Sequence, residues 1–171
     1  MLRPVLTFLA LGACLVSAAC GSGDVDPTGD YQISIVNREN GCHFEGWTEG
    51  TTTPYVVLGI RKSLESPALT GEIQGLAGAW VSLVLGTMQM TGEVDGDEVT
   101  LTLHGTRQLV QNGCSYNVIG TMHGPLEGDF LSGDIDYTTA TNGSPDCGDL
   151  QTCTSRQEFN GTRPPEVPGG P

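Results

Sequence analysis

Four carboxylates lie within six consecutive residues and are the first side chains of this sequence that could do chemistry: Glu93, Asp95, Asp97 and Glu98. Calcium prefers several carboxylate oxygens as ligands, so a calcium ion could bridge this group. The spacing does not match an EF-hand loop, however, and a short acidic turn is well solvated without a cation. We therefore expect an exposed acidic turn without a cofactor, with a calcium site as the alternative.

The three histidines are the other candidates for metal binding or acid–base chemistry: His43, His104 and His123. If the strand that contains His104 continues through a hairpin near Leu109, His123 lies about nine residues along the neighbouring strand. At the usual rise this is roughly 30 Å, so these two histidines cannot share a metal ion. The sequence also lacks a GxSxG elbow, a GxGxxG turn before a helix and a phosphate loop. We predict that the protein is not an enzyme.

The first twenty residues have the pattern of a secretory signal that ends at a cysteine. Arg3 supplies a positive start, and residues 5–16 form an apolar run broken only by Thr7 and Gly12. Twelve helical residues reach about 18 Å against roughly 30 Å of hydrocarbon, too short for a stable membrane span. Such a run fits the apolar region of a signal peptide. The segment Ser17-Ala18-Ala19-Cys20 resembles the lipobox of bacterial lipoprotein precursors.

This resemblance covers residues 1–20 only. It implies that the sulfur of Cys20 receives diacylglycerol and that the chain is cut before this cysteine. Ser17 departs from the pattern, because the family often has an aliphatic residue there, and Leu11-Gly12-Ala13-Cys14 is a competing match that leaves a very short apolar region. An ordinary secretion signal without lipid is the other alternative. Gly21, by the same resemblance, permits export to the outer membrane, so we expect a protein of the bacterial cell envelope.

The four remaining cysteines agree with secretion: Cys42, Cys114, Cys147 and Cys153. An even number in an oxidising compartment suggests two disulfides. Three pairings are possible, and we favour Cys147–Cys153 as a local clip with Cys42–Cys114 as the long bridge. A zinc site is the alternative, but none of the four cysteines belongs to a CxxC pair.

The chain after Cys20 is strongly acidic. It holds twenty acidic and six basic residues, a net charge of −14. Such a surface repels phosphate backbones, so we expect no nucleic-acid partner. It also repels anionic lipid headgroups. The membrane is therefore expected as a partner through the lipid on Cys20 alone, since acyl chains suffice for anchoring.

Alternation of apolar and polar residues with period two predicts strands after residue 28. The clearest example, 99–104, follows Asp95-Gly96, a strong hairpin signal. With these two as turn residues, Gly92 faces Val99 and Met90 faces Leu101. A second hairpin with Glu127-Gly128 as its turn pairs Met122 with Gly133 and Gly120 with Ile135. Further strands are expected over 31–37, 43–48, 55–62, 69–73, 80–85 and 153–162, with a bulge at Gly86.

Eight to ten short strands joined in sequence predict an all-β fold, an antiparallel meander that closes into a small up-and-down β-barrel, with a β-sandwich as the alternative. The glycine-punctuated strands and acidic hairpin tips are faintly similar to lipocalin-like and avidin-like barrels, although the glycine-x-tryptophan opening of lipocalins is missing. We divide the chain into a signal peptide (1–19), the lipidated cysteine with a flexible leash (20–28), one barrel domain (29–163) and a disordered tail (164–171).

These features predict a membrane-anchored lipoprotein that serves as a binding or interaction module of the cell envelope. Its partner would be a small apolar ligand in the barrel or an envelope protein. A cavity lined by aromatic residues would favour the ligand. A barrel filled by its own side chains would favour a protein partner, or the alternative of a purely structural lipoprotein without a ligand.

Overall fold

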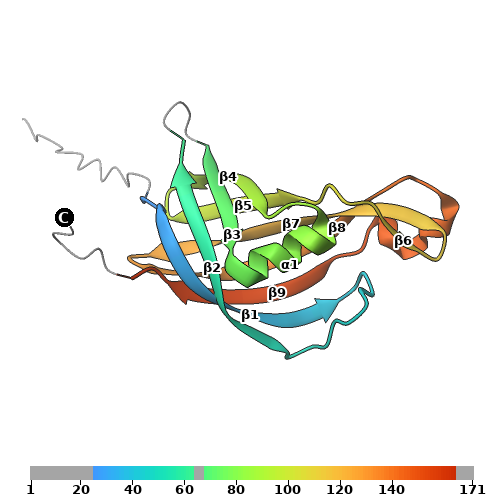
Figure 1. Ribbon diagram of the computed structural model, residues 1–171, viewed down its shortest axis with the longest axis horizontal. Helices are drawn as coiled ribbons and strands as arrows, with labels where there is room; N and C mark the ends of the chain where they lie inside the picture. Colours follow the sequence, from blue (N-terminus) through green and yellow to red (C-terminus); the bar gives the residue numbers. More distant parts are fainter. Residues whose placement is uncertain (1–24, 64–67, 165–171) are drawn as a thin grey trace, which may run out of the picture.

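The computed structural model describes residues 25–63 and 68–164 (Figure 1). The predicted signal peptide, Cys20 and all but the first residue of the predicted tail lie outside the described residues. The elements are β1 (Gly29–Asn40), β2 (Thr52–Lys62), β3 (Leu69–Gln74), α1 (Gly75–Leu85), β4 (Gln89–Asp95), β5 (Glu98–His104), β6 (Leu109–Gln111), β7 (Cys114–Glu127), β8 (Phe130–Thr141), η1 (Pro145–Gln151) and β9 (Ser155–Thr162). Neither of the helices in the described ranges has the length and apolar character needed to cross a membrane.

Eight strands close into an antiparallel barrel. Their order around the barrel is β5-β4-β3-β2-β1-β9-β8-β7, and pairing of β5 with β7 closes it. The ninth strand, β6, pairs only with the beginning of β7, beyond the point where β5 ends. The predicted up-and-down barrel is therefore confirmed. The sandwich alternative is wrong, because a single sheet curls until its two edges meet.

Both predicted hairpins are present, but each turn lies one residue later than predicted. Asp95 pairs with Glu98 and Glu127 with Phe130, so the turn residues are Gly96-Asp97 and Gly128-Asp129. Both glycines have φ of +63° while neither aspartate has a positive φ, as in a type II′ turn, which requires glycine at its first central position. The predicted cross-strand partners are consequently two residues off: Gly92 faces Leu101. A shift of two residues keeps every side chain on its predicted face.

The barrel is filled by its own side chains. All eight barrel strands contribute to one apolar core. Its most deeply buried members, at most 2% exposed, are Tyr31, Leu58, Ile60, Leu69, Val99, Leu101, Leu131 and Phe159. Strict alternation along β7 shows why the prediction of strands succeeded, since every second residue from Cys114 to Leu126 is buried. A small barrel whose interior holds this many large side chains is a packed core.

Residues 80–85, predicted as a strand, belong to α1. This helix begins at Gly75 and ends at Leu85, where Gly86 follows with φ of +83°. The amide of Gly86 donates to the carbonyl of Ser82, so Gly86 is a helix C-terminal glycine rather than a bulge. The prediction was wrong because the segment is apolar on all sides, and the period of such a run does not distinguish a strand from a helix.

Residues 43–48 are not a strand either. They form turns in the long connection between β1 and β2. The side chain of Asn40 fixes the first turn, because its amide donates to the carbonyl of Phe44 and its oxygen accepts the Phe44 amide. His43 has φ of +54°, outside the extended region of regular strand residues.

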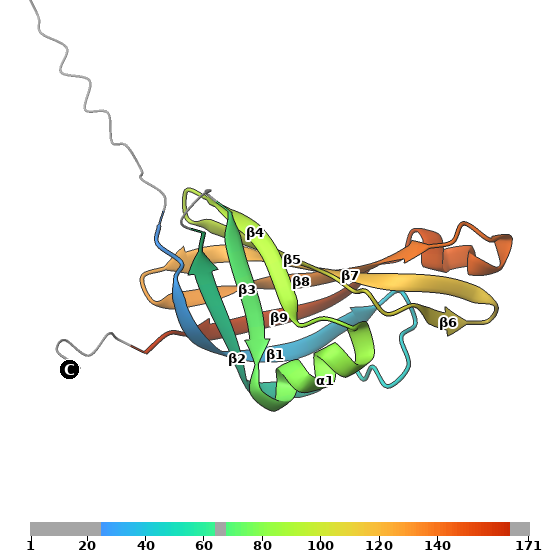
Figure 2. The same cartoon turned by 45° about the horizontal axis from the view of Figure 1, so that its top comes forward.

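The two ends of the barrel differ (Figures 1 and 2). At the first, called here the terminal end, both described termini lie beside the turns β4–β5 and β7–β8. At the second, the helical end, lie α1, the β1–β2 connection, β6 and η1. Residues 25–28, predicted as part of a flexible leash, are instead packed on the terminal end. The Val25 amide donates to Gly96 at 2.9 Å, and the Tyr31 hydroxyl donates to the carbonyl of Pro27 at 3.0 Å.

Candidate functional site

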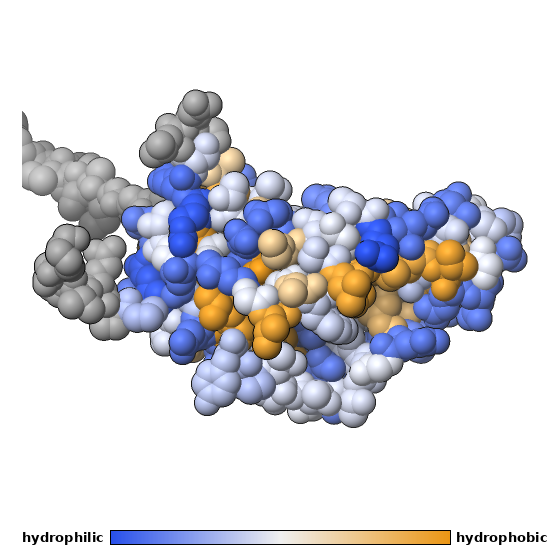
Figure 3. All heavy atoms as spheres, in the orientation of Figure 1, coloured by the Kyte–Doolittle hydropathy of each residue, from blue (hydrophilic) through white to orange (hydrophobic). Residues whose placement is uncertain are grey.

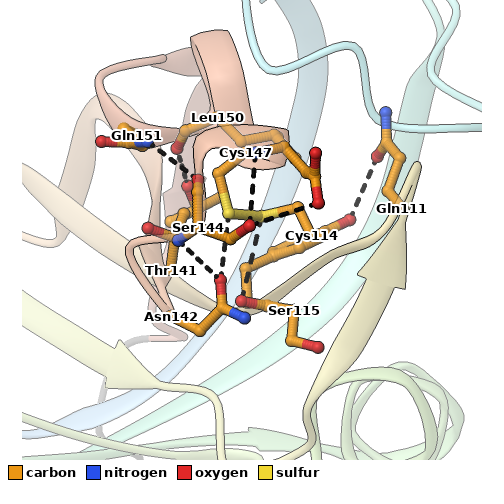
Figure 4. The surroundings of a disulfide bond; sticks show 12 residues. Gln111, Cys114, Ser115, Thr141, Asn142, Ser144, Cys147, Leu150 and Gln151 are labelled. Atoms are coloured by element: carbon orange, nitrogen blue, oxygen red, sulfur yellow. Dashed lines mark hydrogen bonds between the residues drawn. A yellow bond between two sulfur atoms is a disulfide. The ribbon is translucent and has the colours of Figure 1, made fainter.

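Two disulfides join the four predicted cysteines at the helical end, so the predicted number of disulfides is confirmed. Their pairing differs from the favoured one: Cys42 bonds to Cys153, and Cys114 bonds to Cys147 (Figure 4). Because all four sulfurs are in disulfides, the zinc alternative is wrong. The bridged cysteines and Tyr116, Val118 and Leu150 form a second, smaller core. This core supports the part of the sheet that extends beyond the closed barrel.

The pairing of Cys42 with Cys153 follows from closure of the barrel. Strand β1 pairs with β9, and Asn40 faces Ser155 in that register. Two residues further along each antiparallel chain are Cys42 and Cys153, which therefore face each other. Cys147 cannot serve as the local partner of Cys153, because η1 carries it toward the start of β7, where Cys114 lies. Ser144 begins this turn, and its hydroxyl accepts the amide of Asp146.

The acidic turn has no arrangement that would hold a cation. Glu93, Asp95 and Asp97 are exposed and Glu98 is half-buried. Nδ1 of His123 lies 3.9 Å from the Glu98 carboxylate, so this acid interacts across β5 and β7 rather than with the other three. Within the described ranges no three or more His, Cys, Asp or Glu side chains are grouped to bind a metal ion.

His123 belongs to a charged network on the outer wall. Its Nε2 lies 3.2 Å from Asp136, and Arg156 contacts the same carboxylate through Nε at 2.8 Å. The hydrogen bond from Arg156, assisted by the one from His123, holds the pKa of Asp136 below its usual value. This is an acid–base pair in form, but neither of the two clefts described below contains His123.

His104 and His123 are closer together than predicted. Strand β7 pairs with β5 past the insertion of β6, so His104 faces Ile119. His123 is four residues further along β7, roughly 13 Å away at the usual rise. This separation still does not allow them to share a metal ion. The estimate of 30 Å was wrong because it treated β5 and β7 as directly joined.

A cleft of about 220 Å³ lies among the turns beside the two disulfides. Its polar lining residues are His43, Gln111, Asn112, Asp146 and Asp149. His43 and Asn112 both have positive φ, at +54° and +51°. The cleft is open to solvent, and its two acidic residues, Asp146 and Asp149, belong to η1.

A larger cleft of about 600 Å³ lies along α1, and its lining residues are Glu72, Gln74, Gly75, Ala79, Ser82 and Met88. The helix packs one apolar stripe on the barrel through Ala77, Val81 and Leu85. On its outer side Leu76, Trp80 and Leu83 are 92%, 64% and 66% exposed. A helix of a soluble domain normally turns polar residues to water, so an outer apolar stripe indicates a contact surface.

Apolar residues gather in a band across α1 and on toward β6 (Figure 3). Val110 of β6 is 70% exposed. Sequence reasoning missed this surface because it assigned residues 80–85 to a strand. A signal was present, since residues 73–92 contain no charged side chain although the chain is strongly acidic.

No protein-family model, curated protein or solved structure matches the chain.

Proposed function

We propose that this chain is a lipoprotein of the bacterial cell envelope, anchored through Cys20 to the outer membrane, that serves as a protein-interaction module. Its docking surface, called here the α1 face, consists of Leu76, Trp80, Leu83 and the cleft beside them. The observation that carries the proposal is the contrast between a filled interior and an exposed apolar helix. Exposed apolar surface of this kind marks sites of protein contact.

The filled interior argues against the small apolar ligand. The largest side chains of the core, Tyr31 and Phe159, occupy the space in which a ligand-binding barrel would hold its cargo. The described clefts lie outside the core and are open to solvent. A protein partner is therefore the better of the two expected partners.

The arrangement of the two ends supports an anchored module. Val25 is fixed at the terminal end and lies five positions after Cys20. Five residues span at most about 18 Å, so an acylated Cys20 would keep the terminal end near the membrane. The α1 face lies at the opposite end of the barrel, where it can meet other proteins of the envelope. Both disulfides suit an oxidising compartment.

Photo-crosslinking in cells tests the docking surface. A benzophenone amino acid replaces Trp80 in the full precursor, and a matched variant carries it at Asn160, which is exposed on β9. We expect ultraviolet light to produce adducts from position 80 but not from position 160. If the protein is present in the envelope and position 80 gives no protein adduct, the interaction module is wrong. The purely structural lipoprotein then becomes the better description.

A further inference from the structure

The outer surface of α1 carries two parallel rows of unlike size. Leu76 and Trp80, four residues apart, form a prominent ridge. Beside it Gly75 and Ala79, also four residues apart, form a shallow row, and both are exposed. Rows with this spacing are the ridges and grooves through which helices pack on one another.

The shallow row opens into the larger cleft. Gly75, Ala79 and Ser82 form its wall on α1, while Glu72 and Gln74 form its wall on β3. The helix therefore presents a projecting ridge and a hollow next to each other. The volume of about 600 Å³ leaves room for large apolar side chains.

A ridge beside a hollow on the same face is complementary to a copy of itself turned by a two-fold axis. We propose that the partner bound to the α1 face is a second copy of this chain. In the resulting dimer, Leu76 and Trp80 of each copy enter the cleft beside α1 of the other. This inference rests on the proposed function, because it names the partner of the same surface.

The distribution of charged residues around α1 is compatible with a contact between two copies of the chain. Residues 73–92 are uncharged, so two acidic molecules can meet here without bringing like charges into the centre of the interface. The one acid of the cleft is Glu72. Its carboxylate is an acceptor for the indole N–H of an entering Trp80, and a buried indole needs such an acceptor.

The area is sufficient for a specific but modest association. Tyr55, 81% exposed, lies on β2 two residues before Val57, which faces Gln74 at the start of α1. Burial of Tyr55, Leu76, Trp80 and Leu83 removes on the order of 150 Å² each, or about 1,200 Å² over both copies, the lower end for specific interfaces. We therefore expect dissociation in the micromolar range, tightened by salt that screens the repulsion between two acidic bodies.

Sedimentation equilibrium on the exported chain with Cys20→Ser, which carries no lipid, tests the dimer. We expect a monomer–dimer equilibrium that is tighter in about 0.5 M than in about 0.05 M sodium chloride. Trp80→Ser should weaken it at least about tenfold. Phe130→Ser, at a 41% exposed aromatic residue of the terminal end, is the matched control and should leave it unchanged.

Ala79→Leu tests whether the dimer depends on the complementary shapes of the two surfaces or only on their apolar character. The substitution adds apolar surface but fills the shallow row, so it should weaken the dimer about as much as Trp80→Ser. Tighter association of this variant would overturn the proposal. So would a chain that remains monomeric and instead co-sediments with phosphatidylcholine vesicles, since the α1 face would then bind lipid.

The cellular crosslink separates this inference from the proposed function. An adduct of twice the chain mass from position 80 supports the second copy. Adducts of other masses, together with a monomer in the centrifuge, overturn the dimer and leave the interaction module standing. Absence of adducts together with a monomer overturns both.

Discussion

The guanidinium carbon of Arg163 lies 5.8 Å from the ring centroid of Tyr31, so the last described arginine covers the first buried aromatic side chain of the barrel. Arg163 also donates to the carbonyls of Asp26 and Thr28, at 2.9 and 2.6 Å, and to the carboxylate of Asp129 at 2.7 Å. One side chain thus joins the segment 25–28 to the β7–β8 turn and closes the terminal end.

Replacement of Arg163 should loosen the terminal end. We expect Arg163→Ala to lower the free energy of unfolding by about 2 kcal/mol, because the variant loses several charge-assisted hydrogen bonds and the ring contact. Arg163→Lys should recover less than half of the lost free energy of unfolding, since lysine lacks the planar guanidinium group with its several donors. Urea unfolding measures both, and faster hydrogen exchange at the Val25 amide reports release of residues 25–28. Arg107→Ala, at an exposed arginine, is the control; an equal loss there would contradict a specific closing role.

Stability should fall on acidification through Asp136. Its pKa is below the ordinary value because Arg156 and His123 bond to its charged form. A lowered native pKa means that the contribution is present above the unfolded value near pH 4 and is lost as the pH falls through the native pKa. Asp136→Asn should therefore cost about 1 kcal/mol at pH 7 and progressively less as the pH falls below about 4. Urea unfolding at pH 7 and at a series of lower pH values decides this. A pH-independent difference would mean that Asp136 acts through packing instead.

The fold could be predicted because alternation in strands such as β7 records which face is buried, and a closed barrel buries one face of every strand. The cross-strand register could not be predicted from that alternation. Leu101 stays in the core whether it pairs with Met90, as predicted, or with Gly92, as in the structure. Only the turn conformation decides between these two registers. The positive φ of Gly96 places glycine first in the turn, and no property of residues 95–96 alone required that position.

The candidate site was harder to predict because it depends on contacts that are distant in the sequence. The Cys42–Cys153 bridge needs β1 beside β9, so the predicted closure of the barrel already contained this pairing, while the short spacing of Cys147 and Cys153 favoured a local bridge. The α1 face needs a helix where Val81, Leu83 and Leu85 alternate as a strand would. The sequence offers only the absence of charge over 73–92 as a warning.

The disulfide pairing can be tested directly. Proteolysis of the unreduced protein should release one fragment pair that contains Cys42 and Cys153 and another that contains Cys114 and Cys147. By chain entropy the bridges contribute about 5 and about 4 kcal/mol, for separations of 111 and 33 residues. The double variant Cys42→Ala/Cys153→Ala should thus be the less stable of the two bridge deletions in urea. A fragment that holds Cys147 bonded to Cys153 would refute the pairing.

Two glycines of the β4–β5 hairpin should respond differently to a methyl group. Gly96 has φ of +63° and open space around it, so Gly96→Ala should cost only the left-handed strain, about 1 kcal/mol, and Gly96→Asn less. A Cβ on Gly92 would lie 1.8 Å from the carbonyl oxygen of Thr100, so Gly92→Ala must displace β4 from β5. Thermal unfolding compares the three variants. Equal losses for Gly92→Ala and Gly96→Ala would show that the hairpin register is wrong.

Two serine substitutions test the proposed anchor. If Cys20 carries the lipid, Cys20→Ser should move the protein from the membrane fraction to the soluble fraction, because no other acyl attachment is proposed. Cys14→Ser should leave it with the membrane, since Cys14 would be removed with the signal peptide. The intact mass of the membrane-bound form should correspond to a chain that begins at Cys20 with its acyl groups. Release by Cys14→Ser, with retention of Cys20→Ser, would assign the anchor to the competing lipobox. The polar segment from Gly21 would then follow Leu15 and Val16, and the α1 face would stand further from the membrane by the reach of six more residues, about 20 Å.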